Sequence, residues 1–291
     1  MLLVCGIVPQ ERASLIIGEA RFDEGRLFVD DQEIPCSQGT AALVSAACVT
    51  AAFIKRPAPR VVLAGDRGNG RGSRILYDYL IHNIKNINPD VLLMHYIIPV
   101  MGLMKKVCAA TAACSKKTAM IADASSMYAA KAAGLASDFD IFTPDLCEMA
   151  FLADDAAVHP AYISRHLFNA EITRIQELID KAYRHKNAAR TLIVKGSTDH
   201  VVEDGKIIHT ILTPNIEALE AIGGTGDTVS GMLGAFVDAG MAHKEAAITA
   251  LKMNRRAGEY IKATPATKIR DIVVAISRIL NNDKSLNSRK G

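Results

Sequence analysis

The sequence predicts an α/β fold with a mostly parallel central sheet and helices on both faces. Short apolar segments alternate along the chain with segments whose apolar residues recur at the helical period. The strand candidates are apolar throughout, which is typical of parallel strands covered on both faces. We therefore expect ligands to bind at the carboxyl ends of the strands, where such folds place them.

The strand candidates fall into two groups. The apolar segments interpreted as buried strands of the sheet are residues 2–8, 60–65, 90–94, 117–123, 140–143 and 191–195. Two further segments are interpreted as hairpins: residues 13–34 with a turn at Asp23–Gly25, and residues 200–212 with Asp204–Gly205 as the turn. We expect both hairpins to be antiparallel additions to the sheet.

Helices are expected between and after these strands. The helical segments are residues 39–54, 73–87, 99–115, 172–186, 227–240, 243–262 and 267–280. No linker, repeat or low-complexity segment interrupts residues 1–280, so the sequence predicts a single domain. The polar residues 281–291 are interpreted as a C-terminal tail.

Composition narrows the classes of partner. The chain has 34 basic and 31 acidic residues, a net charge of +3, and the basic residues are dispersed, which argues against nucleic-acid binding. The longest apolar run, residues 41–54, is shorter than the roughly 20 residues that a membrane span needs. Six cysteines without a C-x-x-C pair and an opening segment without a basic region predict a cytoplasmic protein with reduced thiols. The small-residue helix at 41–52 is a candidate contact for a homo-oligomer.

The stretch "GGTGDTVSGM" (223–232) carries the clearest chemical signal. Apolar residues from Val229 onward recur at the helical period, so "GGTG" is expected to form the loop that feeds a helix N-terminus. Backbone N–H groups and the helix dipole attract anions there, and glycines allow close approach to a phosphate. Asp227 is either an acid that complements the helix dipole or the base of a phosphoryl transfer, and the full motif favours the base.

The longer stretch "GGTGDTVSGMLGAFVDAGM" resembles the signature of the ribokinase-like superfamily. Within that superfamily it is most similar to the ATP/ADP-dependent NAD(P)H-hydrate dehydratase family, often labelled carbohydrate-kinase-like. The resemblance implies a three-layer sandwich and an enzyme that uses ATP or ADP with Mg²⁺. It also implies Asp227 as catalytic base, with Gly224, Thr225 and Gly226 around the phosphate.

The segment "FTPDLCEM" (142–149) resembles the T-P-N-x-x-E element of the superfamily, which helps to hold Mg²⁺ and phosphates. Asp145 stands at the Asn position and Glu148 matches the Glu, so the resemblance implies that both are metal ligands. The hydrate dehydratases have T-P-H-P-G-E at this point, so "DLC" is closer to the kinases. The alternative is a strand exit at an X-Pro step, followed by a helix with an exposed Glu.

Two further segments resemble the nucleotide site of the family. "VKGSTDHVVEDG" (194–205) is similar to V-L-K-G-x-x-T, which makes Lys195, Gly196 and Ser197 candidates for phosphate binding. A charged strand next to a hairpin explains the same residues without a ligand. Asn254 falls where the superfamily packs a helix against the adenine and is a candidate for nucleotide binding.

Candidates for substrate binding lie in the first half of the chain. "QGTAALVSAA" (38–47) resembles the Gly-Ala-Ala helix start of the dehydratases, with Gly39 and Thr40 in the loop. The glycine-rich segment "AGDRGNGRGSRIL" (64–76) makes Asn69 a candidate contact for an anionic group, with a flexible surface turn as the alternative.

The remaining substrate candidates lie at two strand ends. "IADAS" (121–125) resembles the dehydratase D-A-D-A segment, with Asp123 retained as a candidate contact for substrate or metal. "MHYIIPVMG" (94–102) stands where the dehydratases have G-P-G-x-G, so a remodelled substrate pocket is expected there. His95 is either a ligand-contacting group or a histidine satisfied within the core.

Three functions remain open at this point. The first is a hydrate dehydratase, in which ATP or ADP activates a hydroxyl that then leaves as phosphate. The second is a kinase that stops after phosphorylating a hydroxyl of a small molecule, and the third is a nucleotide-binding sensor without catalysis. The motif around Asp227 favours the first, while Asp145, Glu148 and the missing G-P-G-x-G favour the second.

Overall fold

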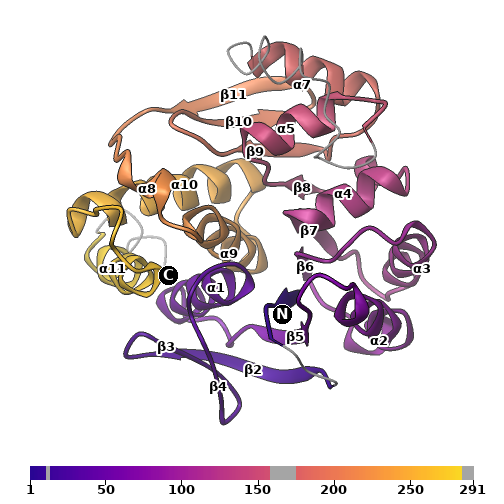
Figure 1. The fold of residues 1–291 in the computed structure, drawn as a ribbon, viewed down its shortest axis with the longest axis horizontal. Helices are drawn as coiled ribbons and strands as arrows, with labels where there is room; N and C mark the ends of the chain where they lie inside the picture. Colours follow the sequence, from indigo (N-terminus) through magenta and orange to yellow (C-terminus); the bar gives the residue numbers. More distant parts are fainter. Residues whose placement is uncertain (11–13, 158–174, 284–291) are drawn as a thin grey trace. The chain divides into compact units, whose positions relative to one another are not determined.

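The computed structural model describes residues 1–10, 14–157 and 175–283 (Figure 1). Its helices and strands alternate along much of the chain, as expected for an α/β fold. Within the described ranges, no helix combines the length and hydropathy that crossing a bilayer requires. The predicted extent of the helix at 172–186 and the tail at 281–291 fall partly outside the described residues.

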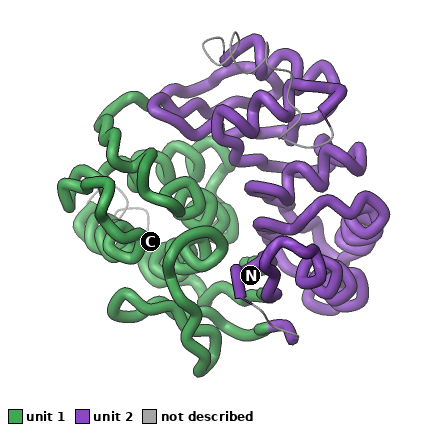
Figure 2. The backbone as a smooth tube through the Cα atoms, viewed as in Figure 1, with its two compact units in different colours: residues 1–4, 16–63, 211–291 green, residues 5–15, 64–210 purple. Residues whose placement is uncertain are grey.

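The chain divides into two compact units (Figure 2). Unit 1 comprises the described part of residues 1–4, 16–63 and 211–291, and unit 2 comprises that of residues 5–15 and 64–210. The boundary passes through strand β1 (Leu2–Val8) and strand β5 (Arg60–Gly65). The single domain over residues 1–280 stays a prediction.

Unit 1 contains an antiparallel group of strands. Strand β2 (Ile16–Asp23) pairs with β5 on one side, in the register Ile16 to Leu63, and with β3 (Arg26–Val29) on the other. Strand β4 (Gln32–Ile34) adds to β3. A second reversal at Asp30, where φ is +48°, therefore divides the strand that the sequence predicted to run continuously to residue 34.

The helices of unit 1 pack closely on one another. They are α1 (Thr40–Phe53), α8 (Ala218–Ala221), α9 (Thr225–Asp238), α10 (His243–Tyr260) and α11 (Ile269–Asn282). Helix α1 is buried along almost its whole length and contacts both α9 and α11. Its contact with α9 is close because a Cβ added to Gly231 would lie 2.0 Å from the carbonyl oxygen of Leu43.

Unit 2 is built on parallel strands. Strands β6 (Val91–His95), β7 (Ala119–Asp123), β8 (Ile141–Phe142) and β9 (Thr191–Val194) are parallel neighbours in that order. Strand β10 (Asp199–Glu203) pairs antiparallel with β9, and β11 (Lys206–Ile211) follows it in the order. The mostly parallel sheet and the second hairpin predicted from the sequence are thus confirmed.

Helices connect the parallel strands of unit 2. They are α2 (Arg71–Ile87), α3 (Met101–Ala112), α4 (Ser125–Ala132), the 3₁₀ helix η1 (Ala136–Asp138), α5 (Leu146–Ala153) and α7 (Ile175–Arg184). Helix α3 contacts α2 and α4, and α5 contacts α7. Because the parallel strands point the same way, their carboxyl ends place His95, Asp123, Pro144 and Lys195 along one edge of the sheet.

Candidate functional site

The glycine-rich loop of unit 1 ends at Gly224, the N-cap of helix α9. Gly224 has φ +100° and ψ −8°, and a Cβ added there would lie 2.9 Å from Cγ1 of Ile269. Only glycine therefore fits both the backbone and the space at this position. Thr225 and Gly226 follow as the first two residues of α9, where the N–H groups have no acceptor within the helix. The Thr225 N–H donates to the Ile222 carbonyl oxygen at 3.4 Å.

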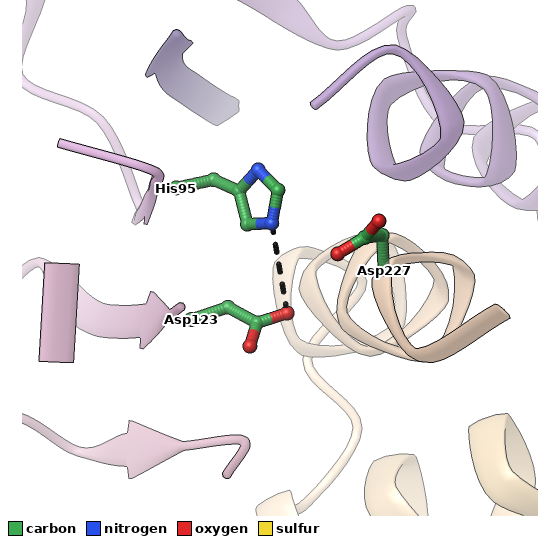
Figure 3. A group of neighbouring side chains, drawn as sticks. All are labelled: His95, Asp123 and Asp227. Atoms are coloured by element: carbon green, nitrogen blue, oxygen red, sulfur yellow. Dashed lines mark ion pairs between the residues drawn. The ribbon is translucent and has the colours of Figure 1, made fainter. Parts of the chain in front are cut away.

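Asp227 lies in the first turn of α9 and is half-buried (Figure 3). The helix dipole stabilises a carboxylate at this position. The sequence-predicted base thus occupies the helix start that the loop was expected to feed. Its placement fits both a catalytic base and an acid that only complements the dipole.

Asn254 is brought to α9 by the packing of α10. Oγ1 of Thr228 lies 2.8 Å from Oδ1 of Asn254 and 2.7 Å from the carbonyl oxygen of Thr225. A hydroxyl has one proton to donate, so it serves one of these two acceptors at a time. Thr228 therefore links the predicted nucleotide-binding residue to the first turn of the anion-binding helix.

The turn at Gly39 and Thr40 starts helix α1, next to the glycine-rich loop of the same unit. A Cβ added to Gly223 would lie 2.6 Å from Oε1 of Gln38, and one added to Gly224 would lie 3.1 Å from Cβ of Ala42. Gly39 has φ +63°, and Thr40 is buried. Unit 1 thus brings together the starts of α9 and α1. The sequence analysis assigned the first to phosphate binding and the second to substrate binding.

The strand ends of unit 2 hold three neighbouring polar side chains. His95 and Asp123 end β6 and β7, are register partners, and point toward each other, with Nε2 3.9 Å from Oδ2 (Figure 3). The Lys195 ammonium, just after β9, lies 3.0 Å from Oδ1 of Asp123. Asp123 and His95 are buried. A buried carboxylate is costly without a partner of opposite charge, and the Lys195 ammonium is that partner for Asp123.

The three residues predicted to bind phosphate after β9 differ in their surroundings. The Lys195 ammonium is paired with Asp123, and the Gly196 N–H donates to Oδ1 of Asp199 at 3.0 Å. Ser197 is exposed at the tip of the same turn. Lys195 and Gly196 thus already have partners within the protein, and the contact of all three residues with phosphate stays a prediction.

Asp145 and Glu148 cap helix α5 by bonding to each other's backbone. The Glu148 N–H donates to Oδ1 of Asp145 at 2.8 Å, and the Asp145 N–H donates to Oε2 of Glu148 at 2.9 Å. The Tyr128 hydroxyl donates to Oε1 of Glu148 at 2.8 Å. The reciprocal capping is a structural role that the sequence pattern D-x-x-E also indicates.

Electrostatics make this group suitable for a cation. Burial raises the pKa of the Glu148 carboxyl, the Lys195 ammonium lowers it, and the charges of Asp123 and Asp145 raise it again. Carboxylates therefore outnumber the ammonium around Glu148, and a divalent cation with oxygen ligands would relieve their repulsion. The residues present thus fit Mg²⁺ at Asp145 and Glu148.

The N–H groups of the glycine-rich loop after β5 bind a carboxylate from within the same loop. The Asp66 carboxylate accepts hydrogen bonds from the N–H groups of Gly68, Asn69 and Gly70 on Oδ1, and from that of Gly72 on Oδ2, at 2.8 to 3.2 Å. Oδ1 of Asn69, the predicted substrate contact, accepts from the Arg71 N–H at 2.9 Å. The loop N–H groups therefore donate to Asp66, and the Asn69 side chain accepts a hydrogen bond from the first residue of helix α2.

Asp66, Tyr128 and Thr228 are polar residues next to the predicted sites that the sequence analysis did not select. An acid two residues before G-x-G-x-G was an available signal for Asp66, because its carboxylate can turn back onto the loop amides. Tyr128 and Thr228 each bond to a residue of another helix, and no local sequence pattern predicts such a bond.

Comparison with known proteins identifies the family of the chain. A family model described as NAD(P)H-hydrate dehydratase matches residues 74–280. The uncharacterized protein MJ1337 of Methanocaldococcus jannaschii is 35% identical over 240 residues, which cover 82% of this chain and 99% of that protein.

Solved structures show the fold. A ribokinase-like superfamily protein of Enterococcus faecalis aligns with a TM-score of 0.57 at 13% identity, covering 97% of this chain and 86% of that one. A hypothetical protein of Streptococcus mutans gives a TM-score of 0.55 at 18% identity, over 96% and 90% of the two chains. The pyridoxal kinase of Staphylococcus aureus gives 0.51 at 16% identity, over 88% and 87%. The ribokinase-like fold predicted from the sequence is confirmed, and the chain belongs to the NAD(P)H-hydrate dehydratase family.

Proposed function

We propose that this protein is an ATP- or ADP-dependent enzyme of the NAD(P)H-hydrate dehydratase type. The observation that carries the proposal is the position of Asp227, in the first turn of α9 directly behind the left-handed turn at Gly224. This segment lies within the residues that match the family. A carboxylate next to the amides of a helix N-terminus suits the transfer of a phosphoryl group to a hydroxyl.

In this proposal each group of unit 1 has one task. Asp227 accepts the proton of the substrate hydroxyl while its oxygen bonds to phosphorus. The amides of Gly224, Thr225 and Gly226 stabilise the negative charge on the phosphoryl oxygens. The new ester then leaves as phosphate, and loss of a proton from the neighbouring ring carbon forms the double bond. Asn254, held by Thr228, contributes to binding of the nucleotide.

In unit 2, Asp145 and Glu148 are proposed to hold Mg²⁺, which supplies positive charge to the phosphates when it is bound. Lys195 and Asp123 form an ion pair at the strand ends, and Ser197, two residues after Lys195, is exposed. His95, Asn69, Gly39 and Thr40 are proposed to line or support the substrate site.

A kinase is the second candidate function. Its support is the aspartate at 145 and the replacement of G-P-G-x-G by residues 94–102, both of which depart from the dehydratases. A kinase would use the same anion-binding loop and the same base, and it would release the phosphorylated alcohol instead of eliminating phosphate.

Small molecules are the proposed partners. The net charge of +3 and the dispersed basic residues support a small substrate and a nucleotide instead of a nucleic acid. A cytoplasmic location, no association with membranes, and a homo-oligomer packed through the small-residue helix at 41–52 stay predictions.

The test follows NADH absorbance after NADH hydrate is mixed with the protein, Mg²⁺ and ATP or ADP, while nucleotide consumption is measured in parallel. Asp227→Asn is expected to lower turnover by about 10²- to 10⁴-fold, the usual contribution of a general base. Asp271→Asn is the matched control, because Asp271 is also a first-turn acid of a unit 1 helix and is exposed.

The outcomes separate the alternatives. If Asp227 only complemented the helix dipole, both variants would lose a similar small amount of stability, about 0.3 to 1 kcal/mol, and turnover would persist. Nucleotide consumption without recovery of NADH, in the presence of a small alcohol, would favour the kinase. Nucleotide binding without any turnover would favour the sensor.

A further inference from the structure

The loop after strand β6 presents a tyrosine in an unusual backbone conformation. Tyr96 has φ +56°, and 46% of its surface is exposed. The other non-glycine residues with positive φ in the described ranges are acidic, basic, Asn or Ala, so Tyr96 alone carries an aromatic ring. Such a φ is an outlier for a bulky side chain, and it persists only where the surrounding structure imposes it.

The surrounding structure does impose it. The Ile97 N–H donates to Oγ of Ser126 at 3.2 Å, and the Ile98 N–H donates to Oγ of Ser73 at 3.1 Å. The Tyr77 hydroxyl donates to the Ile98 carbonyl oxygen at 3.1 Å. Side chains of α2 and α4 thus fix the two residues that directly follow Tyr96. The loop is therefore a rigid support that holds a strained residue.

The ring of Tyr96 is oriented by its neighbour. It packs edge-on against the buried His95 imidazole, with ring centroids 4.3 Å apart and planes at 73°. The loop continues through the half-buried apolar residues 98–100 to the exposed Met101, so partly exposed apolar residues follow Tyr96 in the chain. Asp123, which lies 3.9 Å from the His95 imidazole, and Lys195 supply charged groups at the ends of the neighbouring strands β7 and β9.

An exposed aromatic ring that is rigidly held at a strand end, with apolar residues close in the chain and charged groups at the ends of neighbouring strands, suits a flat heterocycle that carries a polar substituent. We propose that Tyr96 is the platform for the substrate's ring, a six-membered nitrogen heterocycle of the nicotinamide class. This inference rests on the proposed function. Elimination converts two tetrahedral ring carbons into trigonal ones, so the ring flattens, and contact with a flat platform improves along the reaction.

The backbone conformation gives a sharp test, because glycine adopts positive φ without strain. Tyr96→Gly removes the ring and relieves the backbone, whereas Tyr96→Phe keeps the ring. Lys186→Gly is the matched control, because Lys186 has φ +58°, lies in the same unit and is exposed. The probe is reduced nicotinamide mononucleotide, its affinity is measured by calorimetry without ATP or ADP, and ribose 5-phosphate serves as the probe that lacks the ring.

We expect Tyr96→Gly to weaken binding of reduced nicotinamide mononucleotide by about threefold to tenfold, the usual worth of one aromatic contact. Tyr96→Phe and Lys186→Gly should bind it like wild type, and ribose 5-phosphate should not distinguish the variants. The Tm of Tyr96→Gly should equal or exceed that of wild type. If Tyr96 had only a structural role, Tyr96→Gly would lower Tm and would change the binding of both probes equally.

Three results would overturn the proposal: no binding of the probe by wild type, unchanged binding by Tyr96→Gly, or an equal loss in the Phe variant. The binding contrast is independent of turnover. If it holds while NADH hydrate is not converted, the platform stands and the proposed dehydratase activity fails.

Discussion

The Lys195 ammonium lies 3.0 Å from Oδ1 of Asp123, although the two residues are 72 positions apart in the chain. Only 2% of the Asp123 side chain is exposed, and its Oδ1 also accepts the Ala124 N–H at 2.8 Å. The pair joins the ends of β7 and β9 across β8. Lys195 therefore has an electrostatic task within the protein in addition to its predicted contact with phosphate.

Replacing Lys195 should destabilise the protein strongly. Lys195→Met leaves the buried Asp123 without its nearest ammonium, and removing one partner of a buried ion pair typically costs about 3–5 kcal/mol. Lys116→Met is the control, because Lys116 pairs with Asp90 at 2.6 Å where both side chains are largely exposed. Such exposed pairs contribute about 0–1 kcal/mol. Denaturant unfolding measures both variants, and equal losses would contradict a structural role for the Lys195–Asp123 pair.

Stability should depend on pH through Asp66. Burial acts to raise the pKa of this carboxyl, but the backbone N–H groups of Gly68, Gly70, Ser73 and Gly72 outweigh it and hold the pKa below its usual value. A lowered folded-state pKa adds stability that is present above the unfolded value of about 4 and is lost as pH falls through the folded value.

The variant Asp66→Asn tests this dependence, because its amide nitrogen would face N–H donors that need an acceptor. We expect a loss of about 1–3 kcal/mol near neutral pH, shrinking toward zero under acid conditions. Asp78→Asn, at an exposed position on α2, should change stability by less than about 0.5 kcal/mol. Thermal unfolding of the three proteins between acid and neutral pH gives the comparison, and a difference that persists in acid would argue against the carboxylate.

Patterns in the chain predicted the strands and long helices well. The apolar runs at Leu2–Val8 and Arg60–Gly65 begin and end where expected, because polar residues, glycine or proline bound them. The helix Ser125–Ala132 was missed, because eight residues span too few turns for a period to emerge. The equally short helix Leu146–Ala153 was expected only in the alternative interpretation of residues 142–149. Short helices of this kind are set by the strand ends that they follow.

The candidate site was less predictable than the fold. The resemblance located Asp227, Asp145 and Glu148, but it carried no information on which partners their side chains have. The bond from Tyr128 to Glu148 depends on how α4 and α5 pack, and a sequence pattern does not specify that. The glycine-rich segment 64–76 was interpreted as a contact for an anionic group of the substrate, and that contact stays a prediction. The loop amides bind the carboxylate of Asp66, which comes from within the loop.

The Tyr128 hydroxyl should tune metal affinity. Burial raises the pKa of Tyr128, so its hydroxyl stays protonated and donates to Glu148, a proposed Mg²⁺ ligand. Removing a partner that orients a metal ligand usually costs about 10- to 100-fold in affinity. We expect Tyr128→Phe to weaken Mg²⁺ binding by about 10-fold, measured by calorimetry without substrate. Tyr183→Phe, which removes a bond to the Arg190 carbonyl oxygen in the same unit, should leave Mg²⁺ affinity unchanged.

Gly224 should be required for both the shape and the function of the anion-binding loop. Gly224→Ala places a Cβ 2.9 Å from Cγ1 of Ile269 and 3.1 Å from Cβ of Ala42, on a backbone with φ +100°. Gly240→Ala isolates the backbone part of this effect, because Gly240 has φ +88° and no atom within 4 Å of an added Cβ. A residue with a Cβ in the left-handed region costs about 1–2 kcal/mol, which is the loss expected for Gly240→Ala.

The Gly224 variant should lose more, since Ile269 and the start of α1 must move to admit the methyl group. That movement displaces the amides at the start of α9, so affinity for ATP or ADP should fall, whereas Gly240→Ala should bind the nucleotide like wild type. Thermal unfolding and nucleotide calorimetry on the same two proteins separate the contributions, because the backbone strain is common to both and the steric contact is not. If both variants bound nucleotide equally well, the loop at Gly224 would have no part in holding the phosphates.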